Sequence, residues 1–83
     1  MSNKLQTSKN IELTGKLLDY LSSGKNSPNL PEDVSIVPFS KNNKKLNSAN
    51  EKLVEILSKE KPVAIAEEPK TEKQDWKIIP VNF

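Results

Sequence analysis

The sequence predicts a small α/β domain, on the border with the α+β class, in which two helices pack on a partly parallel three-stranded sheet. Its 83 residues suit one domain. Two stretches repeat apolar residues at helical spacing, and short β-branched runs lie on either side of the second stretch. The expected order is therefore α-β-α-β-β. Residues 34–66 form one βαβ unit, whose two strands are parallel.

The first helix is predicted to begin near Asn10, because apolar residues recur at three- and four-residue spacing over 11–21. The preceding residues, 1–8, are mostly polar, and we expect them to form a frayed N-terminus. Gly24 is suited to end the helix. The prolines and asparagines of 25–33 indicate a connecting loop.

A strand, a helix and a second strand are expected next. The run 34–39 has strand character, but Pro38 interrupts it and indicates a strand end, a bulge or a sheet edge. Ser48 and Glu51 have the spacing of a capping box at the start of the second helix. The predicted apolar face of that helix consists of Leu46, Ala49, Leu53, Ile56 and Leu57. The continuous apolar run 63–66 predicts a central strand that is covered on both faces.

The C-terminal part divides into a linker and an apolar segment, beyond a core that spans residues 9–66. Residues 67–75 carry charges of both signs and no apolar side chain, which is typical of a mobile linker. Residues 76–83 form either an edge strand or an interaction segment, because Pro80 weakens pairing on one side. The candidate interaction residues are Trp76, Ile78, Ile79, Val81 and Phe83, since aromatic and large apolar side chains anchor interfaces.

Composition excludes most catalytic chemistry. The chain has no cysteine and no histidine, so thiolate nucleophiles, the usual triads and the commonest metal sites are absent, and we expect neither an enzyme nor a cofactor or metal. Its 13 basic residues are all lysine, against 11 acidic residues, and without arginine sequence-specific nucleic-acid recognition is not expected. No stretch is long and apolar enough for a membrane span or a signal peptide, which favours a cytoplasmic protein.

A lysine-rich turn precedes the second helix. Lys41, Lys44 and Lys45 lie ahead of the predicted helix start, where a helix N-terminus attracts anions. The turn has no glycine of the kind that cradles phosphate, so solvated surface charge is the simpler interpretation. These three lysines are nevertheless the candidate residues for weak anion binding.

The order of short features resembles a small prokaryotic α/β family of unknown function. The resemblance is carried by Asn10-Ile-Glu-Leu13 at the head of a helix, by Pro31 before the first strand, by Asn50 in the second helix and by Pro62-Val63 before the next strand. It covers roughly residues 10–66 and departs from the family pattern in the first loop and beyond Glu67. It implies a fold and brings no catalytic or binding residue with it.

Elimination leaves two functional hypotheses. The first is a non-catalytic protein-interaction or structural module that docks on itself or on another protein through a sheet edge and residues 76–83. The alternative is a small anion- or nucleotide-binding domain that uses the lysine-rich turn, since ligands of parallel sheets lie beyond the carboxyl ends of the strands.

Overall fold

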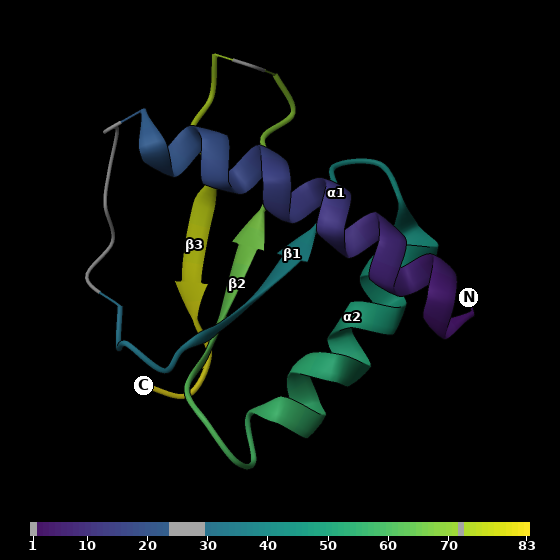
Figure 1. The fold of residues 1–83 in the computed structure, drawn as a ribbon, viewed down its shortest axis with the longest axis vertical. Helices are drawn as coiled ribbons and strands as arrows, with labels where there is room; N and C mark the ends of the chain where they lie inside the picture. The colour runs from purple at the N-terminus through teal and green to yellow at the C-terminus, as the bar shows by residue number, and fades with distance from the viewer. Residues whose placement is uncertain (1, 24–29, 72) are drawn as a thin grey trace.

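A computed structural model describes residues 2–23, 30–71 and 73–83 of the chain. It contains two helices and three strands in the predicted order (Figure 1). Their bounds are α1 (Asn3–Ser22), β1 (Ser35–Phe39), α2 (Lys44–Leu57), β2 (Val63–Glu67) and β3 (Lys77–Pro80). The predicted mixed α/β fold is confirmed.

The three strands form one sheet in the order β1-β2-β3. β1 and β2 are parallel, with Ser35 opposite Val63 and Phe39 opposite Glu67, so α2 makes the crossover of the predicted βαβ unit. β3 returns antiparallel on the other side of β2. β2 is therefore the central strand, and the apolar run that predicted this is buried: Val63, Ala64 and Ala66 are all 0% exposed.

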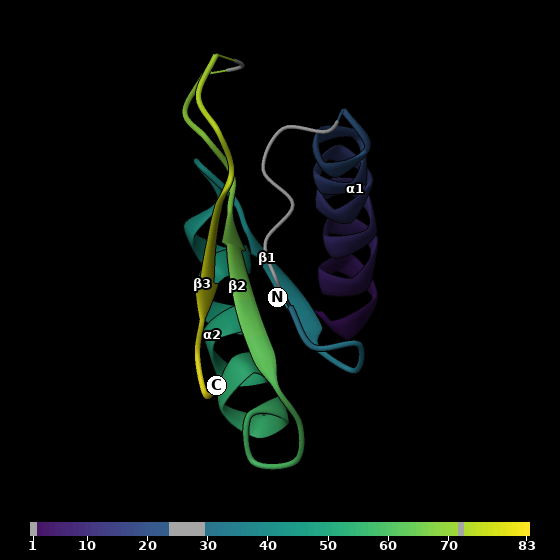
Figure 2. The ribbon, with the colours of Figure 1, turned by 90° about the vertical axis from the view of Figure 1, so that its left-hand side faces the viewer.

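The main apolar core lies between α2 and one face of the sheet. Val37, Val54 and Val63 form its buried centre. Four partly buried side chains pack around them: Phe39, Leu53, Leu57 and Ile65. Because successive strand residues point to opposite faces, Pro38, Ala64 and Ala66 belong to the other face. In Figure 2, α1 stands as a separate layer on one side of the strands, and its buried residues are Leu13 and Leu17.

Helix α2 begins earlier than its sequence pattern indicated. Asn43 is the N-cap, and its side-chain oxygen accepts a hydrogen bond from the Leu46 amide at 3.0 Å. Ser48 is exposed within the helix, so the predicted capping box does not form the helix start. An asparagine at the end of a turn satisfies the free amides of the first turn as well as a serine does, and here it lies nearer the end of β1.

The buried face of α2 also differs from the predicted one. Leu46, Asn50 and Val54 are buried, whereas Ile56 is 63% exposed. The positions 46, 50, 54 and 57 follow one stripe at helical spacing, and Ile56 lies about 100° around the helix from Leu57. The stripe that faces the sheet therefore includes a polar residue and leaves one isoleucine in solvent.

Helix α1 starts at Asn3, well before the predicted start near Asn10. Ser2 caps it by accepting a hydrogen bond from the Leu5 amide at 3.2 Å. Residues 3–8, which we expected to be frayed, are helical, and tertiary contact explains why: the Gln6 side chain reaches α2. The predicted helix end at Gly24 and residues 25–29 of the predicted loop lie outside the described residues.

A buried amide joins α1, α2 and β1. Asn50 is 0% exposed, and its Nδ2 donates to the Pro38 carbonyl and to Asn10 Oδ1, both at 2.8 Å. Its Oδ1 accepts from Asn10 Nδ2 at 3.0 Å and from Gln6 Nε2 at 2.9 Å. All the hydrogen-bonding capacity of this side-chain amide is used. Among the described residues, no helix is long and apolar enough to cross a membrane.

Candidate functional site

A cleft lies where the two parallel strands end. Because β1 and β2 are parallel, their carboxyl ends meet at one edge of the sheet, where Lys41 lies two residues after β1 and Glu68 follows β2 directly. A concavity of about 420 Å³ opens there against the second half of α1. We call it the strand-end cleft, and it is lined by Lys16, Asp19, Tyr20, Lys41, Glu68, Pro69, Thr71, Gln74 and Trp76.

Glu68 ties the two strand ends to α1. Its side chain is only 8% exposed although the residue follows an exposed strand end. One carboxylate oxygen accepts from the Lys41 backbone amide at 3.1 Å, and the other lies 3.4 Å from Lys16 Nζ. The Glu68 amide in turn donates to the Phe39 carbonyl at 2.9 Å. These contacts attach the start of the segment that follows β2 to β1 and to α1.

Tyr20 lines the cleft and carries a buried hydroxyl. Its oxygen is buried and makes no hydrogen bond to any of the described residues. A buried hydroxyl that lacks a partner costs about 1–3 kcal/mol relative to one that is satisfied, so native structures contain few of them. Across the same cleft, Trp76 is half-buried and offers an aromatic surface.

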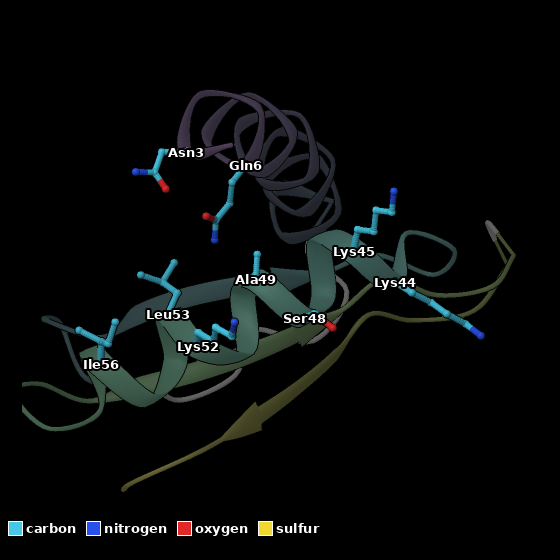
Figure 3. Close-up of a pocket in the computed structure, with 9 residues that line it drawn as sticks. All are labelled: Asn3, Gln6, Lys44, Lys45, Ser48, Ala49, Lys52, Leu53 and Ile56. Carbon is cyan, nitrogen blue, oxygen red and sulfur yellow. The ribbon is translucent and has the colours of Figure 1, made fainter. Parts of the chain in front are cut away.

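A second, larger concavity lies between the N-terminal half of α1 and the outer side of α2. It measures about 770 Å³ and is shown in Figure 3. We call it the α1–α2 groove. It is lined by Asn3, Gln6, Lys44, Lys45, Ser48, Ala49, Lys52, Leu53 and Ile56. Three of these side chains are apolar and three are lysines, and the set contains no carboxylate.

The lysine-rich turn does not form a single site. Lys41 lines the strand-end cleft, whereas Lys44 and Lys45 line the α1–α2 groove. In Figure 3 the side chains of Lys44 and Lys45 extend in different directions from the first turn of α2. All three lysines are exposed. The candidate anion-binding residues are therefore divided between two surfaces.

The candidate interaction residues of the C-terminal segment also lie on more than one surface. Trp76 lines the strand-end cleft, and Ile78 is half-buried in β3. Ile79, Val81 and Phe83 are 37%, 42% and 49% exposed. These last three form what we call the C-terminal apolar patch.

Asn82 fastens this segment to the rest of the domain. Its Nδ2 donates to the carbonyls of Ser58 and Lys61, and its Oδ1 accepts from the Val63 amide, each at 2.8 Å. The Val81 amide donates to the Val63 carbonyl at 2.9 Å. The patch is consequently held in a defined position next to β2.

Both outer edges of the sheet carry a proline. The Ser35 and Val81 amides donate toward β2, so by alternation the backbone groups of Pro38 in β1 and Pro80 in β3 face outward. Neither residue has an N–H to offer to an added strand. The outward carbonyl of Pro38 is already bonded to Asn50. The edges are therefore poor templates for strand addition.

Sequence reasoning missed several residues of these two concavities. The sequence analysis assigned no binding role to Tyr20 or Glu68 in the strand-end cleft, or to Lys52 in the α1–α2 groove. The predicted βαβ unit did contain a signal, since residues just after parallel strands converge at one edge. Applied to Lys41 and Glu68, that rule would have placed them together.

The described residues contain no group of three or more acidic side chains that could hold a metal ion. Comparison with protein-family models, with curated proteins and with solved structures finds no match for this chain. The two concavities and the C-terminal apolar patch are therefore the surfaces that suggest a function.

Proposed function

We propose that this chain is a non-catalytic protein-interaction module of the cytoplasm that binds an acidic, amphipathic segment of a partner protein in the α1–α2 groove. The observation that carries the proposal is the lining of the groove. Ala49, Leu53 and Ile56 supply an apolar floor, and no carboxylate accompanies the lysines around it. A partner helix with apolar residues at i, i+3 or i+4 and i+7, flanked by Asp and Glu, matches this chemistry.

The placement of two of the lysines supports a binding role. Lys44 and Lys45 occupy the first turn of α2, which contains no acidic residue. Positive charge there opposes the helix dipole, and each such charge costs about 0.3–1 kcal/mol. Residues that break a local rule for stability tend to lie at functional sites. An acidic partner would interact favourably with both the lysines and the helix N-terminus.

A synthetic peptide with this pattern tests the proposal. We expect an amphipathic peptide that carries Leu or Ile on one face and Glu on the other to bind, and a scrambled peptide of the same composition to bind at least tenfold more weakly. Binding should weaken as salt is added, because exposed charges are screened. Isothermal titration calorimetry at two salt concentrations measures both effects.

Variants assign the binding to the groove. Lys52→Glu and Ile56→Ser should each reduce peptide affinity by about tenfold, which corresponds to about 1.4 kcal/mol. Lys59→Glu is the matched control, because Lys59 is exposed beyond the end of α2 and does not line the groove. Equal affinity of the parent and the two groove variants, or no binding by the parent, would contradict the proposal.

We propose self-association for the C-terminal apolar patch. Ile79, Val81 and Phe83 expose apolar surface on a segment that Asn82 holds in place, and a second copy presents the same patch for two-fold packing. Because Pro80 removes an outward donor, the contact would be made by side chains rather than by strand addition. Sedimentation velocity should show an oligomer for the parent and a monomer for Val81→Ser.

Ile11→Ser is the matched control for this experiment. Ile11 is 68% exposed on α1, away from the C-terminal segment. If Ile11→Ser rather than Val81→Ser abolished association, α1 would be the interface. A parent that sediments as a monomer at every concentration would refute self-association.

A further inference from the structure

We infer that the strand-end cleft binds a small ligand that combines an aromatic ring with a phosphate group, the chemistry of a nucleotide. The cleft is separate from the α1–α2 groove and from the C-terminal apolar patch, so this binding would be a second function beside protein interaction. Three properties of the lining support it, and each is independent of the others.

The first property is position and size. The cleft lies beyond the carboxyl ends of two parallel strands, where ligands of open α/β sheets bind. Its volume of about 420 Å³ falls within the range that small-molecule sites occupy. Glu68 fixes this edge by bonding to the Lys41 amide and to Lys16, so the site is largely formed before a ligand enters.

The second property is the buried hydroxyl of Tyr20. It has no partner among the described residues, and it belongs to a side chain that lines the cleft. Because this oxygen has almost no accessible surface, a ligand atom reaches it only when the side chain turns toward the cleft, and a hydrogen bond made there would remove the cost of leaving it unsatisfied. Buried polar groups without partners are uncommon in native structures, so this hydroxyl calls for an explanation.

The third property is the combination of charges and an aromatic ring. Within the described part of the chain the Lys41 ammonium pairs with no carboxylate, whereas Lys16 is paired with Glu68. Lys41 is thus available to a phosphate. Trp76 provides a surface on which a base can stack. Asp19 accepts hydrogen bonds from hydroxyl or amino groups and disfavours a ligand that is purely anionic.

The three lysines of the lysine-rich turn do not all lie at the cleft. Only Lys41 reaches this end of the sheet, and the other two lysines line the groove on the far side of the α2 N-terminus. The ligand would therefore contact one lysine of the turn together with residues from α1 and from the segment before β3.

Adenosine 5′-monophosphate is the probe we would use, with adenosine and inorganic phosphate as separate arms. Trp76 is the only tryptophan, so its indole N–H gives a single assignable NMR signal in the cleft. We expect the nucleotide to shift this signal and the Lys41 and Glu68 amides at low millimolar concentration. Adenosine should bind more weakly, and phosphate alone should shift the Lys41 amide without moving the indole signal.

Three variants complete the test. Tyr20→Phe removes only the hydroxyl, and Lys41→Gln removes the charge while the backbone bond to Glu68 stays, so each should weaken nucleotide binding about three- to tenfold. Lys45→Gln is the matched control and should bind as the parent does. The inference would be overturned if the indole signal did not move, if both cleft variants bound the nucleotide as tightly as the parent does, or if the shifts were confined to Lys44 and Lys45. None of these outcomes depends on the peptide experiments in the groove.

Discussion

At the scale of single residues, the most constrained side chain is Asn50. It is completely buried, and its amide makes four hydrogen bonds that connect two helices and the outer edge of β1. A buried amide contributes little net stability when satisfied, but removing it leaves several partners without a bond. Its main effect is to fix where α1 lies against α2, because only one register of the two helices satisfies every group.

Replacing Asn50 with alanine should therefore be costly. We expect Asn50→Ala to lower the free energy of unfolding by about 2–3 kcal/mol, since the buried Pro38 carbonyl and the half-buried Asn10 amide lose their partner. Gln6→Ala, which removes one half-buried partner, should cost less than about 1 kcal/mol. Urea denaturation of both variants measures the difference. A value for Asn50→Ala within about 0.5 kcal/mol of the parent would show that the junction does not hold the helices together.

The cap of α2 is a second residue-scale feature that can be tested directly. Asn43 bonds to the Leu46 amide, whereas Ser48 lies in an exposed position within the helix. Asn43→Ala should cost about 1 kcal/mol, and Ser48→Ala should change stability by less than about 0.5 kcal/mol. The reverse order of the two effects, read from thermal or urea melts, would favour the capping box that the sequence pattern indicated.

At the scale of elements, the orientation of α2 decides which of its residues belong to the core. Leu46 is 1% exposed and Ile56 is 63% exposed, although both were predicted on one apolar face. Leu46→Ala should lower stability by about 2–5 kcal/mol because it opens a cavity. Ile56→Ala should stay within about 0.5 kcal/mol of the parent, because a surface change has little to disrupt. Similar losses in the two variants would mean that the helix is rotated from its place here.

The elements show where sequence reasoning succeeds and where it stops. The order of elements and the parallel pair followed from periodicity and from the crossover rule, which depend on local pattern alone. The start of α1 could not be predicted from local pattern, because residues 3–8 are held in the helix partly by a contact from Gln6 to Asn50, which is distant in sequence. Lys41 was predicted at the carboxyl ends of the parallel strands, but the contribution of Tyr20 to the same cleft was not, since the end of α1 meets this edge only in the folded chain.

At the scale of the whole molecule, both edges of the sheet are protected against the addition of a further strand. The sheet has two edges, and each presents a proline outward, while the carbonyl of Pro38 is bonded to Asn50. A small sheet with open edges tends to add strands from other copies. Under the proposals above, recognition would use side chains in the groove, in the cleft and in the C-terminal apolar patch rather than added strands. Association through these surfaces would not extend the sheet.

The edge at β3 gives the last prediction, since a single residue there blocks strand addition. Pro80→Val restores an outward N–H at a position opposite Ala64, in a strand whose other backbone groups already suit pairing. We expect this variant to form larger assemblies than the parent as concentration rises, with added β-sheet signal in circular dichroism and increased light scattering. Ile78→Val is the matched control, because it changes a side chain of the same strand and leaves every donor in place. Assemblies of equal size for Pro80→Val, Ile78→Val and the parent would show that the proline is not what protects this edge.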